Sequence, residues 1–226
     1  MCDFVCNALS LELRWVRDGQ VPVEVVNWIT GVAGDRAPRS RVDAYWLAGD
    51  LECSTVKVRA VVNRRTGRIR ARRVECKQLQ GRLGLVRVTP QLVGLAELWQ
   101  KSRVDAAPAP LPEADDLHPS PEWVFVQKQR IRLRTAGLVP RTSTSIEITE
   151  ISARDRVAWS VAAQARGPVR PATLQTLLRE AITVAFPTWP EEVSLGPGES
   201  GSYGAWLRRS VAHGLDDADA ASRRDR

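Results

Sequence analysis

Apolar and polar side chains alternate along several stretches of the chain. Successive side chains of a β-strand point to opposite faces, so this alternation predicts strands with one apolar and one polar face. Seven stretches show it: residues 11–16, 41–47, 55–62, 68–77, 123–134, 145–151 and 157–165. Two pairs of neighbouring stretches are expected to form hairpins, across residues 63–67 and 153–156. The pattern therefore indicates mainly antiparallel β-structure.

Helical patterns are fewer and shorter. Residues 172–186 place Leu174, Leu177 and Leu178 at helical spacing, between Pro171 and Pro187. Short helices are also expected at residues 24–29 and 202–207, and a loop rich in Gly, Pro and Arg at residues 31–40. Residues 96–103 fit either a helix or a strand.

One predicted strand, residues 123–134, has a strongly cationic face. Four side chains stand two residues apart on it: Lys128, Arg130, Arg132 and Arg134. Like charges along one face repel each other, so a fold keeps them only where that face meets water or an anion. A solvated sheet face and an anion-binding face both fit this strand.

Charged side chains recur on the polar faces of the other predicted strands. They are Glu12 and Arg14, Arg41 and Asp43, Lys57 and Arg59, Arg73, Glu75 and Lys77, and Glu147. A sheet with one face open to water would show no preference for paired Arg and Glu. The pattern favours a closed antiparallel barrel with a charged, hydrated interior and an apolar exterior partly covered by helices. We therefore predict an α+β fold, mainly antiparallel β, flanked by a few helices.

We expect one domain over residues 1–215. The chain has 226 residues and 43% apolar residues, which is enough for a core. Residues 106–121 contain five prolines and several acids, and are predicted to form a surface connection. Residues 216–226 are charged and poor in apolar side chains, so a disordered tail is predicted there.

The net charge is +7, and all but four of the 33 basic residues are arginine. An arginine-preferring genome would explain that ratio, while the excess charge favours phosphate-bearing partners. The four cysteines form no C-x-x-C pair and the two histidines lie far from them, which argues against a zinc site. The N-terminus lacks the features of a signal peptide, and no stretch approaches about 20 apolar residues. The expectation is a soluble, cytoplasmic protein without a membrane partner.

The order of the charged strands resembles the CYTH-like, or triphosphate tunnel, superfamily. The N-terminal E-x-E-x-K motif of that family is similar to Ser10-Leu-Glu12-Leu-Arg14, and its K-x-R-x-R strand to Lys128-Gln-Arg130-Ile-Arg132. The strands between and after them resemble Arg41-Val-Asp43-Ala-Tyr45, Thr55-Val-Lys57-Val-Arg59, Val74-Glu75-Cys-Lys77, Ile146-Glu147-Ile-Thr149 and Trp159-Ser-Val-Ala-Ala-Gln164-Ala. Each motif is short, so their common order over residues 11–207 carries the resemblance.

This resemblance implies an eight-stranded tunnel that takes a phosphate-rich small molecule: a triphosphate, polyphosphate or nucleotide. The implied ligand-binding cations are Arg14, Arg41, Lys57, Arg59, Arg73, Lys77, Lys128, Arg130, Arg132 and Arg134. Glu12, Glu75 and Glu147 are the implied ligands of Mg²⁺ or Mn²⁺, with Glu75 as the candidate catalytic residue. Ser10 and Gln164 stand where the family has glutamates, which weakens the implied metal site.

Three functions remain open. The first is a binding module that captures a phosphate-rich ligand without turnover, which the two missing acids favour. The second is a metal-dependent triphosphatase or cyclase acting on organic triphosphates. The third, a nucleic-acid-binding β-module, is weakest, because a basic face turned into a narrow barrel cannot meet a duplex. The carboxylates equally fit a structural role, paired with arginines inside a wet barrel.

Overall fold

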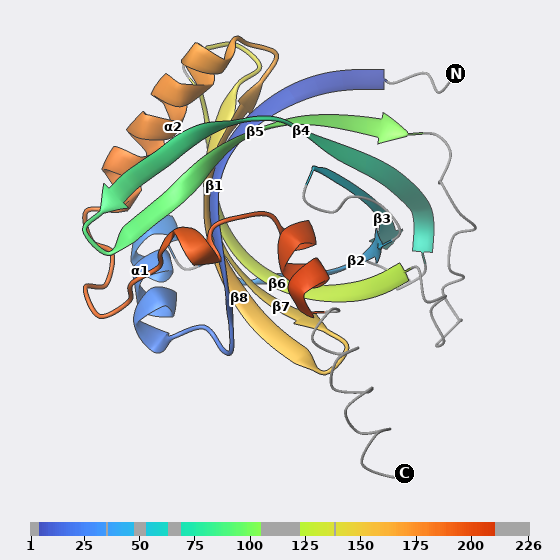
Figure 1. Ribbon diagram of the computed structural model, residues 1–226, viewed down its shortest axis with the longest axis horizontal. Coiled ribbons are helices and arrows are strands. Elements are labelled where there is room, and N and C mark those ends of the chain that lie inside the picture. Colours follow the sequence, from blue (N-terminus) through green and yellow to red (C-terminus); the bar gives the residue numbers. More distant parts are fainter. Residues whose placement is uncertain are drawn as a thin grey trace.

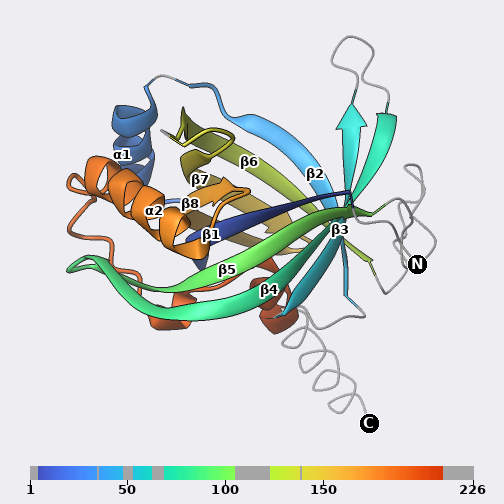
Figure 2. The ribbon, with the colours of Figure 1, turned by 90° about the horizontal axis from the view of Figure 1, so that it is seen from above.

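Eight antiparallel strands close into a barrel (Figures 1 and 2). The strands are β1 (Val5–Asp18), β2 (Arg39–Trp46), β3 (Ser54–Val62), β4 (Ile69–Thr89), β5 (Leu92–Val104), β6 (Trp123–Ala136), β7 (Ser143–Ala153) and β8 (Arg156–Gly167). Around the barrel their order is β1-β5-β4-β3-β2-β6-β7-β8. The prediction of a closed, eight-stranded antiparallel barrel is confirmed.

The computed structural model describes residues 5–34, 36–47, 53–62, 69–104, 123–137 and 139–210, without the side chains of residues 5–7, 60–62, 69–73, 103 and 104. The predicted turn at 63–67, the proline-rich segment at 106–121 and the tail at 216–226 lie outside these ranges. Among the helices of the described part, none is long and apolar enough to cross a membrane.

Two helices cover one side of the barrel (Figure 1): α1 (Val23–Ala33) and α2 (Pro171–Ala185). A 3-10 turn, η1 (Pro197–Glu199), and a helix at residues 203–210 follow. The loop predicted at residues 31–40 was wrong at both ends, because β2 begins at Arg39 and α1 continues to Ala33. That residue and Trp28 are buried in the core, and Gly34, with φ of 72°, ends the helix.

Residues 96–103, which fitted either a helix or a strand, are extended and belong to β5. Strand β4 also runs far beyond the predicted end at residue 77, and its far half pairs with β5 in a long hairpin that reaches the side where α1 and α2 lie (Figure 2). Register shifts interrupt this pairing between Leu79 and Gly81 and between Arg82 and Leu85. Such irregularities break the two-residue alternation, which is why the pattern did not predict this hairpin.

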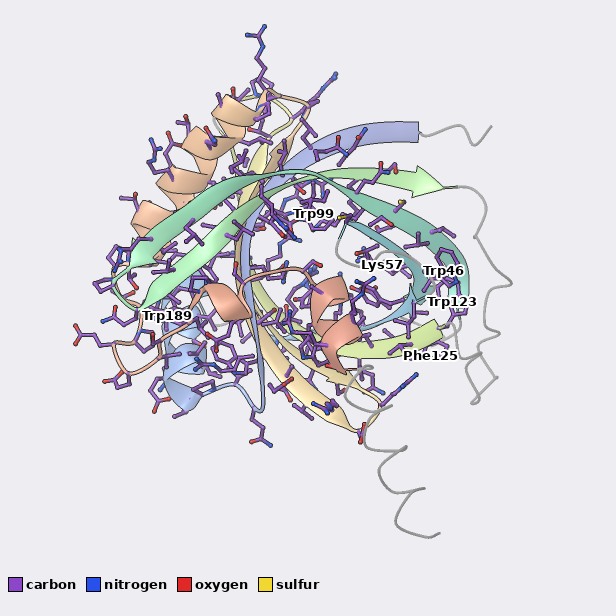
Figure 3. The ribbon with its side chains drawn as sticks, in the orientation of Figure 1. Trp46, Lys57, Trp99, Trp123, Phe125 and Trp189 are labelled. Atoms are coloured by element: carbon purple, nitrogen blue, oxygen red, sulfur yellow. The ribbon has the colours of Figure 1, made fainter. Side chains whose placement is uncertain are left out.

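The main hydrophobic core lies outside the barrel wall, beneath the helices. Leu11, Leu13 and Trp15 of β1 pack there with Leu174 and Leu178 of α2. Burial of each such side chain stabilises the fold by about 1.5–3 kcal/mol. A smaller apolar cluster with Trp46, Trp123 and Phe125 lies on another part of the wall, as Figure 3 shows. Apolar side chains outside the wall leave the polar faces of the strands to the interior.

One end of the barrel interior is filled by apolar side chains. Val124 and Val126 of β6 and Ile151 of β7 pack there against Trp206 and Leu207 of the last helix. Beyond this apolar layer the inward residues of the same strands are charged. The helix at 203–210 therefore closes the barrel at one end and sets the floor of the charged region.

Candidate functional site

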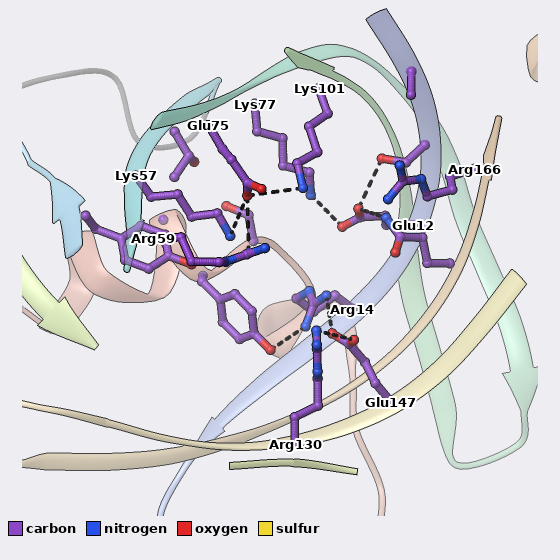
Figure 4. Close-up of a pocket in the computed structure, with 18 of the residues that line it drawn as sticks. Glu12, Arg14, Lys57, Arg59, Glu75, Lys77, Lys101, Arg130, Glu147 and Arg166 are labelled. Carbon is purple, nitrogen blue, oxygen red and sulfur yellow. Dashed lines mark hydrogen bonds and ion pairs between the residues drawn. The ribbon is translucent and has the colours of Figure 1, made fainter. Parts of the chain in front are cut away.

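The charged part of the interior encloses a cavity of about 190 Å³, called the barrel cavity below (Figure 4). All eight strands line it, together with residues 202–204. Nine of the lining side chains are Lys or Arg, namely Arg14, Arg41, Lys57, Arg59, Lys77, Lys101, Arg130, Arg132 and Arg166. Three are carboxylates, namely Glu12, Glu75 and Glu147. Positive charge thus dominates the cavity.

Glu147 on β7 lies within a cluster of arginines. Arg14 Nη2 donates to its Oε1 at 2.9 Å and Arg130 Nη1 to its Oε2 at 3.3 Å, while Arg132 Nε lies 3.8 Å away. Burial alone would raise the pKa of Glu147, but the three guanidinium groups outweigh it and hold that pKa far below its ordinary value. Arg14 also donates to the Tyr203 hydroxyl at 2.6 Å, which ties the last helix to the cavity.

Glu75 on β4 is the centre of a second cluster. Its Oε2 lies 3.5 Å from Lys57 Nζ, 3.2 Å from Arg59 Nη2 and 3.1 Å from Lys101 Nζ. Burial favours the neutral carboxyl, but these cations outweigh it and lower the pKa of Glu75 to about 2. Burial lowers the pKa of Lys57 to about 8 despite the neighbouring charge of Asp43. The ammonium of Lys57 therefore titrates nearer to neutral pH than that of an ordinary lysine.

Asp43 on β2 forms a buried ionic layer beside that cluster. Four cations lie near its carboxylate: Arg41 at 3.2 Å, Lys57 at 3.4 Å, Arg59 at 3.1 Å and Lys128 at 3.3 Å. The ammonium of Lys128 lies 4.6 Å from the ring centroid of Tyr45 and 4.0 Å from that of Tyr203. Burial lowers the pKa of Lys128 well below its ordinary value. Asp43 thereby holds Arg41, Lys57 and Arg59, three cations that line the cavity, in fixed positions.

Glu12 on β1 has a different set of partners. Its Oε2 accepts a 2.6 Å bond from Lys77 Nζ, and its Oε1 accepts from Ser10 Oγ at 3.1 Å and from Gln164 Nε2. Lys77 also lies over the ring of Trp99, 4.6 Å from its centroid. Burial would raise the pKa of Glu12, but the charges of Lys77 and Arg14 outweigh the effect of burial, and the pKa is lowered. Glu12 is thus ionised and already held by three protein donors.

Most of the sequence-predicted site residues line the barrel cavity: Arg14, Arg41, Lys57, Arg59, Lys77, Arg130, Arg132 and the three glutamates. Two of the other predicted ligand-binding residues lie elsewhere. Lys128 is fully buried beneath the cavity, and Arg134 is exposed at the end of β6, where it donates to Ser143 Oγ at 3.4 Å. The side chain of Arg73 lies outside the described part of the chain.

Lys101, Arg166 and Tyr203 are among the lining residues that were not predicted from the sequence. Lys101 was missed because residues 96–103 were not assigned to a strand. Arg166 stands two residues beyond Gln164 on β8, so the alternation of that strand carried the signal that could have identified it. Tyr203 enters the cavity from the last helix, and no local pattern indicates that placement.

Three guanidinium groups in the cavity have an unused donor. The Nε atoms of Arg41, Arg130 and Arg132 are buried and have no hydrogen-bond partner among the described residues. A buried donor left without a partner costs about 1–3 kcal/mol. All three residues line the same cavity, so a bound anion could accept from each of them.

The carboxylates of the cavity do not fit a protein-held Mg²⁺ or Mn²⁺. Such ions take oxygen ligands, commonly one or two carboxylates together with substrate phosphates. Glu12, Glu75 and Glu147 are each already ion-paired with Lys or Arg, in three separate clusters. Within the described residues, no three His, Cys, Asp or Glu side chains are grouped so that they could hold a metal ion. A metal ion would first have to displace a protein cation.

No protein-family model matches the sequence, and no curated protein matches it. Among solved structures, the fold is similar to the mimivirus capping enzyme triphosphatase, with 9% identity, coverage of 78% of this chain and 89% of that chain, and a TM-score of 0.43. It is also similar to the RNA triphosphatase Pct1 of S. pombe, with 11% identity, coverage of 95% and 83%, and a TM-score of 0.32. Because these identities and TM-scores are low, the solved structures do not indicate a function, and only the geometry of the barrel cavity does.

Proposed function

We propose that the barrel cavity binds the phosphate chain of a triphosphate, polyphosphate or nucleotide, without metal-dependent turnover. The observation that carries this proposal is the excess of cations, since nine Lys or Arg side chains and only three carboxylates line a cavity of about 190 Å³. Ion pairs inside the cavity neutralise only part of that charge. A multivalent phosphate chain supplies the missing negative charge in a compact form.

The arginines are also suited to phosphate by their donor geometry. Burial and neighbouring arginines lower the pKa of Arg130 and Arg132, even though Glu147 opposes this. Both guanidinium groups are therefore under electrostatic strain that an anion would relieve. A guanidinium fork donates to two phosphate oxygens at once, and both residues line the cavity.

The size of the cavity restricts the ligand. Sites for drug-sized molecules commonly enclose about 300–1,000 Å³, which is more than the barrel cavity offers. The aromatic lining consists of Tyr45 and Tyr203, and both hydroxyl groups already contact protein cations. The cavity thus suits a phosphate chain better than a base or another bulky organic group.

Isothermal titration calorimetry of the full chain with sodium tripolyphosphate in EDTA tests the proposal. The wild type should bind, and the double variant Arg130→Gln/Arg132→Gln should bind about a hundredfold more weakly, because two charge-assisted contacts are lost. Arg87→Gln is the matched control, since Arg87 is exposed on the outer part of the β4–β5 hairpin. Absence of wild-type binding would refute the proposal.

Two further outcomes would replace the proposed function by one of the alternatives. Phosphate release from ATP, GTP, thiamine triphosphate or tripolyphosphate with Mg²⁺ or Mn²⁺, abolished by Glu75→Gln, would establish a metal-dependent hydrolase. Binding of single-stranded or duplex nucleic acid that falls with salt but is insensitive to the Arg130 and Arg132 changes would indicate an exterior basic surface.

A further inference from the structure

Lys77 is held in a fixed position on the wall of the barrel cavity. Its side chain starts on β4 and ends 2.6 Å from Glu12 Oε2 on β1 (Figure 4). Its ammonium also lies over the ring of Trp99 on the neighbouring β5. Trp99 is itself buried and fixed by a 3.1 Å bond from its Nε1 to Glu97 Oε2. An ammonium held by a carboxylate and an aromatic face forms a cationic site within the wall.

Protein donors correspondingly occupy most of the acceptor positions of Glu12. A carboxylate offers about four lone-pair positions. Three are occupied, by Ser10 and Gln164 on Oε1 and by Lys77 on Oε2. Gln164 is the direct cross-strand partner of Glu12 on β8, so this arrangement is built into the register of the barrel. The other cross-strand partner, Glu97, is engaged by Trp99 and lies 3.6 Å from Arg82.

We infer that Lys77 is the resident cation of this wall and that the barrel cavity binds its phosphate chain in the metal-free form. This inference rests on the proposed function and specifies its ligand. A divalent ion brought in with the ligand would meet the Lys77 ammonium next to Glu12 and would add charge to a cavity already rich in cations. Divalent cations in solution should therefore antagonise binding by sequestering the ligand.

The test compares tripolyphosphate binding to the wild type in EDTA and in Mg²⁺ in excess over the ligand, at matched ionic strength. We expect Mg²⁺ to weaken binding by about tenfold or more. Equal affinity in the two buffers, or tighter binding in Mg²⁺, would overturn the inference while leaving phosphate-chain binding intact. Absence of binding in both buffers would instead refute the proposed function.

Variants of the Lys77–Glu12 ion pair give a second test. Removing the Glu12 charge should change the affinity for tripolyphosphate in opposite directions at a metal-free site and at a metal site. Glu12→Gln frees Lys77 and removes a negative charge, so tripolyphosphate in EDTA should bind about threefold more tightly or better. At a metal site that change would weaken binding. Lys77→Met should weaken binding about tenfold, and Mg²⁺ should not restore it. Glu150→Gln and Arg87→Gln, both at exposed positions, are the matched controls.

These outcomes remain interpretable if a variant is unstable, because the Mg²⁺ comparison uses the unmodified chain. Near-ultraviolet circular dichroism reports whether each variant keeps its packed tryptophans. Weaker binding by a folded Glu12→Gln protein, or restoration of Lys77→Met by Mg²⁺, would overturn the inference.

Discussion

Lys128 Nζ lies 3.3 Å from Asp43 Oδ2, and neither side chain is exposed to solvent. A buried charge that loses its partner is strongly destabilising, whereas the removal of both charges often is not. Asp43→Asn should therefore lower the free energy of unfolding by about 3–5 kcal/mol. Adding Lys128→Met should restore part of that loss. Urea unfolding followed by tryptophan fluorescence measures both changes.

The control for that prediction is Asp155→Asn, at an exposed position in the turn between β7 and β8. It should change the free energy of unfolding by less than about 0.5 kcal/mol. A similarly small effect of Asp43→Asn would contradict the prediction that the buried ion pairs of Asp43 stabilise the fold.

Acid should destabilise the fold through the cavity carboxylates. Cations hold the pKa of Glu75 at about 2, below its ordinary value of 4.5, and also lower the pKa values of Glu12 and Glu147. The unfolded chain then binds more protons than the folded one, so stability present above about pH 4.5 is lost as pH falls towards 2. Glu75→Gln should remove on the order of 2 kcal/mol of this pH dependence, measured by urea unfolding between pH 6 and 3. Glu150→Gln should preserve the wild-type slope.

Lys57 should couple ligand binding to proton uptake. Its pKa is lowered to about 8 by burial, and a bound polyanion would favour the charged ammonium. We expect affinity for tripolyphosphate to fall as pH rises from 7 to 9. Calorimetry at pH 8 in two buffers with different ionisation enthalpies should show proton uptake that Lys57→Met reduces. Unchanged uptake in that variant would assign the protons to the ligand alone.

The lowered pKa of Lys57 has the opposite effect on the folding stability of the ligand-free protein, which should rise with pH. Between pH 8 and the ordinary lysine value of 10.5, the unfolded chain binds more protons at Lys57 than the folded chain does. The contribution of Lys57 to stability should therefore rise with pH in this window. Urea unfolding of wild type and Lys57→Met across pH 8–10 measures the difference.

Restoring carboxylates beside Glu12 should create a metal site. Ser10 and Gln164 both hydrogen bond to Glu12, so Ser10→Glu together with Gln164→Glu would bring three carboxylates to one point. Electron paramagnetic resonance should then detect bound Mn²⁺ that the wild type does not bind. The control is Ser40→Glu/Gln129→Glu, which adds the same two carboxylates at exposed cross-strand partners that do not line the cavity. Equal Mn²⁺ binding by wild type would contradict the assignment of Lys77 as the resident cation.

Local alternation was sufficient for much of the barrel. Strands β6, β7 and β8 were predicted closely because the pairing among them has no register shift that would disturb the two-residue period. The β4–β5 hairpin was not, since its register shifts disturb that period. Lys101 was missed with it, although it lies 3.1 Å from Glu75 at the centre of the cavity.

The sequence by itself determined that charged side chains recur on one face of the predicted strands, because the direction of a side chain in a strand depends only on local backbone geometry. Only the tertiary structure decided which charges meet. Lys77 reaches Glu12 because barrel closure places β4, β5 and β1 side by side, and Lys128 lost its access to the cavity because Tyr203 covers it from a helix distant in sequence. Strand register and barrel closure depend on contacts between residues far apart in the sequence. They place similar cations in three different settings: Lys128 is buried against Asp43, Lys77 is held by Glu12 on the cavity wall, and Arg130 and Arg132 can bind an anion.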